Sequence, residues 1–415
     1  MKISKPYPLV SIIIPHWNNY PILEECLESL KNISYQNCEI IVTDNASADG
    51  SSDKIKQHFP EINLVENKTN EGFAGGCNRG ATQANGKYLL FLNNDTTHAH
   101  NWIEPLVTQL EQDKSIAAVQ PKILNYFQQN LFDYAGGCGG HMDILCYPFA
   151  RGRIFFKQEI DTGQYNKVNN IFWASGTAIM VRKNLFEKVG RFDKTFFAHM
   201  EEIDLCWRFH MLGYGVLVEP SSKVYHKNAV TLPMYSQKKY YLNHRNSLYM
   251  LCSNYSIPLT IYFLPLRIAL DIIAFFYAMS KLDWKHMTAI VMAVFWLISA
   301  TTCPMLTPVG PRAGPNGGAA VAFPPSINDS TVCFPIVFPL NNYNLCVTLA
   351  TNYGLFKNHS VFLAIIFYIL ALYHPATTEG DNYNKADIFI KSQIKKLTCN
   401  CFKFSEESYT LNSVH

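Results

Sequence analysis

Three polar residues, Asn93-Asn94-Asp95, directly follow an apolar run at residues 88–92, and chemistry is first expected there. The run reads as a buried strand, and ligands of open α/β sheets bind beyond the carboxyl ends of their strands. Mg²⁺ and Mn²⁺ favour carboxylate, water and phosphate oxygens. Asp95 is therefore a candidate ligand of a divalent cation that bridges the phosphates of a nucleotide. The tripeptide alone is also ordinary turn chemistry.

A second group of carboxylates, Glu201-Glu202-Ile203-Asp204, lies at the start of a predicted amphipathic helix. A carboxylate within hydrogen-bond reach of a hydroxyl can act as a general base. Asp204 and Arg208 are four residues apart and are expected to pair along the helix, which favours a structural role. Glu201 and Glu202 precede the helix, whose positive end stabilises charged carboxylates. They are the candidate bases, and the alternative is that all three acidic residues only cap the helix.

Alternating strands and helices are expected to position these groups. Short β-branched runs read as buried strands and are separated by helical stretches; the strands are predicted at residues 9–15, 38–43, 62–65 and 88–92, and the helices around residues 22–30 and from near Ser52. The second run delivers another acidic residue, Asp44, to the end of a strand. This alternation predicts an α/β fold with a doubly wound, mostly parallel sheet and all polar loops on one edge.

A glycine-rich stretch at residues 72–80 follows the third predicted strand. Its spacing differs from the dinucleotide-binding fingerprint, and that fingerprint follows the first strand of a fold. Two interpretations stay open: a helix start packed closely on the sheet, and direct contact with a nucleotide.

The order and spacing of six segments resemble one known family. The segments are Val10-Ser11-Ile12-Ile13-Ile14-Pro15, Asp44-Asn45-Ala46-Ser47, Asn70-x-Gly72-Phe73-Ala74-Gly75-Gly76-x-Asn78, Asn93-Asn94-Asp95, Trp173-Ala174-Ser175-Gly176 and Glu201-Glu202-Ile203-Asp204-Leu205-Cys206-Trp207-Arg208. Over roughly residues 8–295 the chain is similar to family-2 glycosyltransferases with the GT-A fold, in the branch that contains rhamnosyltransferase-like enzymes. The resemblance implies an inverting transfer of a sugar from a nucleoside diphosphate. Such a transfer expels a diphosphate, whose charge a metal can neutralise, and needs a base for the attacking hydroxyl.

The resemblance also implies roles for the two acidic groups. Asp95 becomes the carboxylate of the metal-binding motif, with Mn²⁺ or Mg²⁺ as the cofactor, and Asn93 stands where a second acidic residue is more usual. Glu202 becomes the general base, with Glu201 as the second candidate. His226 follows the strand predicted at residues 215–218 and is expected to complete the metal shell or contact the diphosphate, since neutral imidazole is a competent ligand. A purely structural histidine is the alternative.

Substrate contacts are assigned in the same way. Those with the nucleotide are Pro15, Asp44, Gly72 and Asn94, with Asp44 holding the base. Those with the sugar or acceptor are Trp173, Gly176, Asp143 and Arg245. Asp143 lies in an irregular segment, residues 136–153, rich in glycine, aromatic residues and arginine, which suit sugars and phosphates. Asp143 equally suits a turn, and Arg245 equally suits a solvated helix face.

Length and composition limit the alternatives. A chain of 415 residues allows one large catalytic domain with an appendage. A formal net charge of +3 is too small to indicate a nucleic-acid partner. The 12 cysteines lack metal-type spacing and fit a reducing cytosol. The first apolar run is short and ends at Pro15, so we interpret it as a strand rather than a signal peptide.

Beyond about residue 255 the sequence becomes apolar. Residues 258–280 carry Arg267 and Asp271 four apart, which favours an interfacial helix over a simple membrane span. Residues 287–303 barely reach spanning length and residues 360–373 are shorter still, so a core helix is the alternative for each. Contact with a membrane surface would suit the glycan or lipid-linked acceptor that the resemblance implies, at the cytoplasmic face of the cell membrane in cell-surface polysaccharide biosynthesis.

Three parts of the chain are predicted: a catalytic domain at residues 1–250, membrane-associated helices at 251–303, and an atypical tail of low charge at 304–415. Every candidate catalytic residue lies before Asn246, so a chain ending near Ser280 is expected to keep donor binding. The competing hypothesis is a nucleotide-sugar or glycan-binding protein that has lost catalysis, given Asn93 and Glu202 at two key positions. A nucleotidyltransferase built on the same kind of sheet is a third reading.

Overall fold

The structure is a computed structural model that describes residues 7–154, 157–228, 235–302, 333–340 and 343–350. Its elements in chain order are β1 (Val10–His16), α1 (Tyr20–Lys31), β2 (Cys38–Asp44), α2 (Ser51–His58), β3 (Asn63–Glu66), α3 (Gly72–Gln83), β4 (Tyr88–Leu92), β5 (Thr96–His98), α4 (Ile103–Gln112), β6 (Ile116–Asn125), β7 (Gly140–Met142), β8 (Pro148–Ala150), β9 (Arg153–Ile154), β10 (Lys157–Gln158), β11 (Asn169–Asn170), β12 (Ala178–Arg182), α5 (Lys183–Lys188), the 3₁₀ helix η1 (Lys194–Phe196), α6 (Glu201–Met211), β13 (Gly215–His226), α7 (Gln237–Asn254), α8 (Ile257–Ser280), α9 (Trp284–Thr302), β14 (Cys333–Leu340) and β15 (Tyr343–Ala350).

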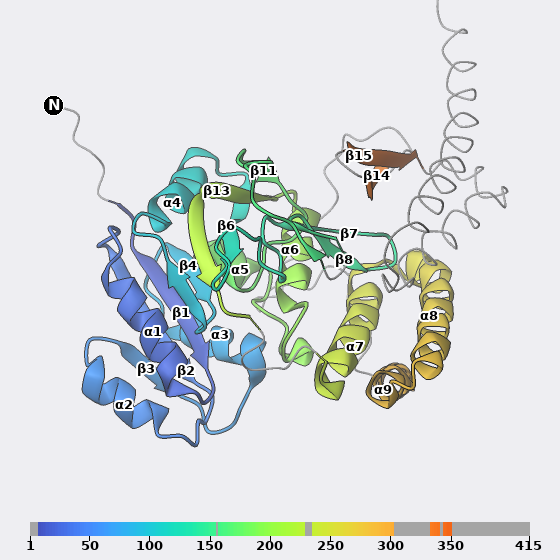
Figure 1. Ribbon diagram of the computed structural model, residues 1–415, viewed down its shortest axis with the longest axis horizontal. Helices are drawn as coiled ribbons and strands as arrows, with labels where there is room; N and C mark the ends of the chain where they lie inside the picture. Colours follow the sequence, from blue (N-terminus) through green and yellow to red (C-terminus); the bar gives the residue numbers. More distant parts are fainter. Residues whose placement is uncertain (1–6, 155–156, 229–234, 303–332, 341–342, 351–415) are drawn as a thin grey trace, which may run out of the picture. The chain divides into compact units, whose positions relative to one another are not determined.

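A central sheet organises residues 10–226, slightly more than the first half of the chain (Figure 1). Its order is β11-β13-β6-β12-β4-β1-β2-β3, and β5 pairs with β13. β1 runs parallel to β2 and β4, β2 runs parallel to β3, and β13 runs parallel to β6. Only β12 separates the two parallel groups, antiparallel to both β4 and β6. The predicted α/β class with a mostly parallel, doubly wound sheet is confirmed.

Both faces of the sheet are buried, which explains the β-branched runs in the sequence. Ile13, Ile41 and Phe91 face one core together with α3 and α6. Their neighbours Ile12, Val42 and other strand residues face a second core with α1 and α4. Because side chains alternate along a strand, each of these strands supplies apolar groups to both cores.

The last described helices form their own packed group. α7, α8 and α9 lie side by side (Figure 1), and Leu248 of α7 packs against Ala293 and Leu297 of α9. Arg267 and Asp271 are both buried on α8 and pair at 3.4 Å, as their four-residue spacing predicts. Among the described residues, α8 alone is long and apolar enough to cross a membrane by length and composition.

The predicted three-part division of the chain stays a prediction. Of the tail at residues 304–415, the structure describes β14 and β15, which pair in a two-stranded sheet. The apolar run at residues 360–373 lies outside the described residues.

Candidate active site

The parallel strands β1, β2 and β4 deliver their carboxyl ends to one edge of the sheet. His16 is level with Asp44 in the β1–β2 register, and the loop that contains Asp95 follows the end of β4. Pro15, the residue before His16, lies against Gly76 of α3, where an added Cβ would stand 3.1 Å from the proline Cβ. The structure therefore brings the predicted nucleotide-binding and metal-binding residues to a common edge.

Asp44 is buried and already hydrogen bonded within its own loop. Its carboxylate accepts hydrogen bonds from the backbone N–H of Ser47 at 3.2 Å, from the Ser47 hydroxyl, and from the Ser52 hydroxyl at 2.8 Å. These bonds close the turn after β2 and lead into α2. A nucleotide base would share a carboxylate whose position is fixed in advance.

Asn94 is held by a histidine that the sequence did not single out. The Asn94 side-chain nitrogen lies 2.9 Å from His16 Nδ1, and His16 Nε2 lies 2.9 Å from the Ser51 hydroxyl. An amide nitrogen only donates, so Nδ1 accepts and the ring hydrogen is on Nε2. Burial lowers the pKa of His16, which agrees with this neutral form.

His226, at the end of β13, lies between two buried carboxylates. Its Nε2 is 3.1 Å from Asp95 Oδ1, and its Nδ1 is 3.2 Å from Asp133 Oδ1. Burial lowers the pKa of His226, but the two carboxylates outweigh this effect and raise it to about 10. Burial raises the pKa of Asp95, and the adjacent imidazole outweighs it and leaves that pKa below its ordinary value. The structure therefore places His226 beside Asp95, and the expectation that both bind a metal ion stays a prediction.

The donor set at this point fits a divalent cation that is also held by a substrate. Among the described residues, no group of three or more His, Cys, Asp or Glu side chains could hold a metal ion. Asp95 Oδ1 is buried and accepts no hydrogen bond, and the Asn93 side chain lies 3.4 Å from His226 Nε2. Mg²⁺ is commonly bound by one or two carboxylates together with substrate phosphates and waters. Asp95 can supply the protein's share of such a shell, and His226 can join it once its Nε2 has released its proton to make room for the cation.

The second acidic group begins α6, and its two glutamates face different surroundings. Glu201 is only 3% exposed and lies near Cys77 of α3. Glu202 is half-buried and stands beside Gly176, where an added Cβ would be 3.7 Å from its carboxyl carbon. Glu202 is thus the more exposed residue of the two, while the Oε2 atoms of both carboxylates are buried and have no hydrogen-bond partner.

Residues 175–177 connect the two acidic groups. Gly176 contacts Glu202, and the carbonyl of the next residue, Thr177, accepts a hydrogen bond from the Asn93 backbone N–H at 2.9 Å. Glu202 and the loop that contains Asp95 therefore contact neighbouring residues of the same short segment.

Both glutamates are shifted toward the protonated form. Burial raises the pKa of Glu201 well above its ordinary value, and the charges of Glu202 and Asp204 raise it further. Burial also raises the pKa of Glu202, and backbone N–H groups, including that of Gly176, partly oppose the shift. A raised pKa suits a carboxylate that must take up a proton during a reaction.

Asp204 and Arg208 have the structural role that their spacing predicts. The Asp204 carboxylate accepts from Arg208 Nε at 2.9 Å and from the Asn254 side chain at 2.9 Å. Arg208 also donates to the backbone carbonyl of Val189 at 2.6 Å. The pair ties α6 to α7 and leaves neither residue free for catalysis.

The glycine-rich helix α3 serves close packing. An added Cβ would stand 2.5 Å from Ile13 at Gly80, and 2.8 Å from the Asn45 side-chain nitrogen at Gly76. Gly72 has φ +72°, and an added Cβ there would meet the Phe197 carbonyl at 2.3 Å. The close packing that the first interpretation expects is present at these glycines, and Gly72 lies against the loop that precedes Glu201. The contact of Gly72 with a nucleotide stays a prediction.

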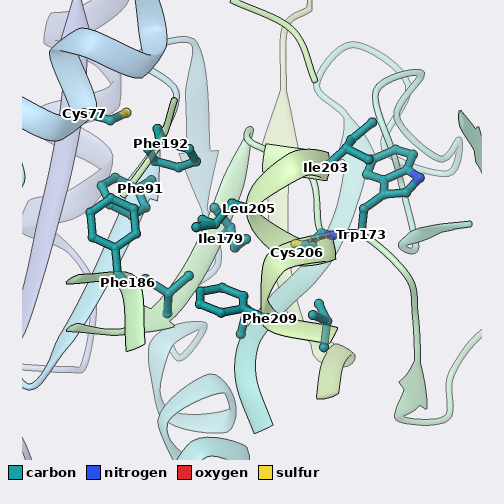
Figure 2. Packing of buried hydrophobic residues seen from close by; sticks show 14 of the residues in the cluster. Cys77, Phe91, Trp173, Ile179, Phe186, Phe192, Ile203, Leu205, Cys206 and Phe209 are labelled. Carbon is teal, nitrogen blue, oxygen red and sulfur yellow. Dashed lines mark hydrogen bonds between the residues drawn. The ribbon is translucent and has the colours of Figure 1, made fainter. Parts of the chain in front are cut away.

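Trp173 lies in the core, which favours a structural role over a sugar contact. It is 6% exposed, and its indole N–H donates to the His141 carbonyl at 2.8 Å. Figure 2 shows its ring on the side of α6 that carries Ile203 and Cys206. Gly140 has no side chain because the indole occupies that space, 1.9 Å from where a Cβ would be.

Asp143 and Arg245 also have partners within the chain. Asp143 accepts from the backbone N–H groups of Leu145 and Tyr147, both at 2.9 Å, and so forms the turn between β7 and β8. Burial raises the pKa of Asp143 to about 6. Arg245 donates to the carbonyls of Thr195 and Phe196 at 2.7 and 2.8 Å. The structure favours the turn interpretation for Asp143. Arg245 is on α7, and its guanidinium contacts the segment before α6 instead of lying on a solvated helix face.

Three residues of the site were missed from the sequence: His16, Asp133 and Asn246. His16 ends the first strand, so its position at the edge could have identified it. Asp133 and Asn246 reach the site across separations of 93 and 47 or more residues, and neither follows a strand that the sequence predicts. No local pattern marks them.

Residues 11–190 match the model of a protein family described as "Glycosyl transferase family 2". An uncharacterized glycosyltransferase of Haemophilus influenzae is 35% identical over 119 residues, which cover 27% of this chain and 36% of the relative. Glycosyltransferase GlyG of Streptococcus pneumoniae serotype 4 is 28% identical over 186 residues, which cover 44% of this chain and 59% of the relative. This chain therefore spans between about a third and three fifths of the length of these two relatives.

A third relative carries a more specific name. The N-acetylglucosaminyl-diphospho-decaprenol L-rhamnosyltransferase of Mycobacterium tuberculosis is 24% identical over 226 residues, which cover 50% of this chain and 73% of the relative.

Proposed function

We propose that this chain, whose residues 11–190 match the model of glycosyl transferase family 2, is an inverting glycosyltransferase with a nucleoside-diphosphate sugar as donor. The observation that carries the proposal is that Glu202 and the loop of Asp95, which pairs with His226, both contact residues 176–177. A diphosphate leaving group needs positive charge, and an attacking hydroxyl needs a proton acceptor. Asp95 with His226 is suited to the first task and Glu202 to the second.

Each side of the site has a defined task. Asp95 and His226 would hold a Mn²⁺ or Mg²⁺ ion, and the ion would supply positive charge to balance the charge that develops on the diphosphate leaving group. Glu202 accepts the proton of the acceptor hydroxyl as the hydroxyl oxygen attacks the anomeric carbon. The bond to the diphosphate breaks on the opposite face, so the configuration at that carbon inverts. Asp44 and Asn94 hold the nucleoside at the ends of β2 and β4.

A glycan or lipid-linked acceptor at the cytoplasmic face of the cell membrane fits the C-terminal helices. The supporting observation is an exposed apolar face on α8 and α9, which includes Ile261, Ile273, Phe276, Trp284, Phe295 and Ile298. The charged pair Arg267–Asp271 is buried on the other face of α8, toward α7. An apolar face of this kind can lie in the interface of a membrane. The diphospho-decaprenol in the name of the mycobacterial relative is an acceptor of the same class.

The test is a donor screen on the full-length protein. Thermal unfolding is measured with Mn²⁺ and a panel of UDP-, GDP- and dTDP-sugars, since a ligand that binds only the folded state raises the melting temperature. Release of free nucleoside diphosphate from the stabilising donor is then followed over time. We expect one nucleotide class to stabilise the protein and to be hydrolysed slowly without an acceptor.

The same screen addresses the competing function. Asn93 replaces a second carboxylate at the metal side, which would suit a binding protein without catalysis. Stabilisation by a nucleotide sugar with no release of nucleoside diphosphate, with or without membrane extracts as acceptor, would favour that reading and contradict the transferase.

A further inference from the structure

The loop between η1 and α6 has an unusual backbone. Phe197, His199 and Met200 all have positive φ, at 64°, 69° and 74°. Phe197 has φ 64° and ψ −60°, and the Ala198 N–H donates to the Phe196 carbonyl at 2.7 Å, which is a classic γ-turn. None of these residues is glycine, so the conformation is strained and needs outside support. Glu201 and Glu202 follow immediately.

One side chain from α7 provides most of that support. The Asn246 side-chain nitrogen lies 3.1 Å from the carbonyl oxygen of Phe196, 2.9 Å from that of Ala198 and 2.6 Å from that of His199. Asn246 is fully buried. One amide nitrogen thus bonds three of the four carbonyls of residues 196–199 and keeps them close together.

Arg245 fixes the direction of this amide. Its Nε donates to the Asn246 side-chain oxygen at 2.7 Å, and its terminal nitrogen donates to that oxygen and to the carbonyls of Thr195 and Phe196. A guanidinium only donates, so the amide oxygen must face it and the amide nitrogen must face the loop. Tyr249, one turn further along α7, donates to Asp193 at 2.7 Å on the same segment.

We propose that Asn246, oriented by Arg245, is a positioning residue for the general base: it holds the strained loop of residues 197–200 so that Glu202 stands at Gly176. The proposal rests on the proposed function, in which Glu202 is the base, and adds the residue that positions Glu202. Met200 begins α6 with a left-handed backbone, and its carbonyl accepts from the Asp204 N–H at 2.9 Å. A relaxed loop would therefore change the direction from which the first turn of α6, and Glu202 with it, enters the site.

Two variants of Asn246 and one of Arg245 test the role. Asn246→Asp keeps the size of the side chain but sets an oxygen against three carbonyl oxygens, and Asn246→Ala removes the contacts. Arg245→Gln leaves Asn246 in place without its full set of orienting donors. We expect donor-hydrolysis kcat to fall by about 100-fold in Asn246→Asp and less in Arg245→Gln, because a base misplaced by about 1 Å can cost that much. The affinity for UDP and GDP with Mn²⁺ should stay within about twofold, since the groups that hold the nucleotide are elsewhere.

Ser247→Ala is the matched control. Ser247 is the next residue on α7, is also buried, and bonds a loop carbonyl, that of Cys146 at 2.8 Å, and Arg267 at 2.6 Å. It does not contact residues 196–200. Ser247→Ala should lower the melting temperature as an Asn246 variant does, and leave kcat unchanged. If both variants lower kcat equally, Asn246 is merely structural and the proposal is wrong.

Two further measurements separate this proposal from the proposed function. On a Glu202→Gln background, Asn246→Asp should change the residual hydrolysis by less than about threefold, because a residue that acts through Glu202 has nothing left to position. An undiminished effect on that background would overturn the proposal even though the transferase reading survives. Hydrogen exchange needs no activity: the amides of residues 197–202 should exchange at least about 10-fold faster in Asn246→Ala than in Ser247→Ala. Equal exchange in the two variants would refute the proposal that Asn246 holds residues 197–200. If exchange differs as expected but the unaltered protein hydrolyses no donor, the result counts against the proposed function and not against the role of Asn246 in holding the loop.

Discussion

The imidazole of His226 is held on both sides by carboxylates, with Asp133 Oδ1 3.2 Å from its Nδ1 while Asp95 approaches its Nε2. Asp133 has no exposed surface and also accepts a hydrogen bond from the Ala135 N–H at 2.7 Å, so its position is fixed. Carboxylates in this position orient a metal-binding histidine and set which nitrogen carries the hydrogen. We therefore predict that Asp133 supports metal binding indirectly, by orienting His226.

Asp133→Asn is expected to weaken Mn²⁺ binding by about 10- to 100-fold, the usual cost of removing such a partner. Titration of the protein with Mn²⁺ in the presence of UDP or GDP measures the effect. Asp161→Asn is the matched control, because Asp161 pairs with the buried Lys122 at 2.7 Å and is not in contact with His226. Equal losses of Mn²⁺ affinity in the two variants would show a general loss of stability instead.

Asp95→Ala is expected to abolish transfer and the Mn²⁺- or Mg²⁺-dependent part of nucleoside-diphosphate binding. The reason is that Asp95 supplies the only carboxylate of the pair that faces the proposed cation. Calorimetry with and without the cation separates metal-dependent affinity from the rest. A variant whose affinity responds to Mn²⁺ as the unaltered protein does would exclude Asp95 as a ligand.

Glu202→Gln is expected to keep donor binding and to lower turnover by about 10²-fold or more, the scale associated with a lost general base. Glu201→Gln should have a smaller effect on turnover, since Glu201 is buried toward α3 and Glu202 stands at Gly176. Rates of donor hydrolysis by the two variants are compared at saturating donor. A more damaging Glu201→Gln would assign the base to Glu201.

Glu201 should make the folded state less stable as the pH rises. Its pKa in the folded protein is raised by burial and by the charges of Glu202 and Asp204, so the folded state holds a proton that the unfolded chain releases. Stability associated with this group is full below its ordinary pKa, near 4.3, and is lost as the pH rises toward the higher folded value. Glu201→Gln should therefore raise the melting temperature at pH 8 relative to the unaltered protein and have little effect near pH 4.5. An increase of the same size at both pH values would show that titration of Glu201 is not the cause.

Replacing the exposed apolar residues Phe276 and Phe295 by serine should reduce sedimentation with anionic vesicles and leave UDP or GDP binding intact. These side chains are 56% and 65% exposed, so their loss removes membrane contact without opening the core. Exposed Phe127, at 73%, provides a control replacement away from these helices. Undiminished vesicle binding by the Phe276 and Phe295 variant would refute this surface as the membrane contact.

The sequence predicts the residues at the ends of the strands well, but not the residues that support them from distant elements, and the reason is physical. Asp44 and Asp95 were placed correctly because strand ends follow from short apolar runs and polar turns, which are local. Asp133 and Asn246 could not be found, because their partners are set by how distant elements pack. The surroundings of Trp173, predicted as a sugar or acceptor contact, could not be foreseen for the same reason: only the packed structure shows that Gly136 and Gly140 leave space for its ring in the core.

The ring of Trp296 on α9 lies 5.3 Å from the Arg245 guanidinium and 5.7 Å from the Tyr249 ring, both on the face of α7 that holds the loop before α6. A chain ended after Ser280, which the sequence alone predicts to keep its donor site, lacks this ring. If segments were swapped between related proteins, α7 to α9 and residues 193–202 would have to be moved together. A chimera that takes only the helices from a relative would leave the strained loop of this protein without the residues that support it. A chimera that takes both segments from the relative should keep the donor-hydrolysis rate of the unaltered protein.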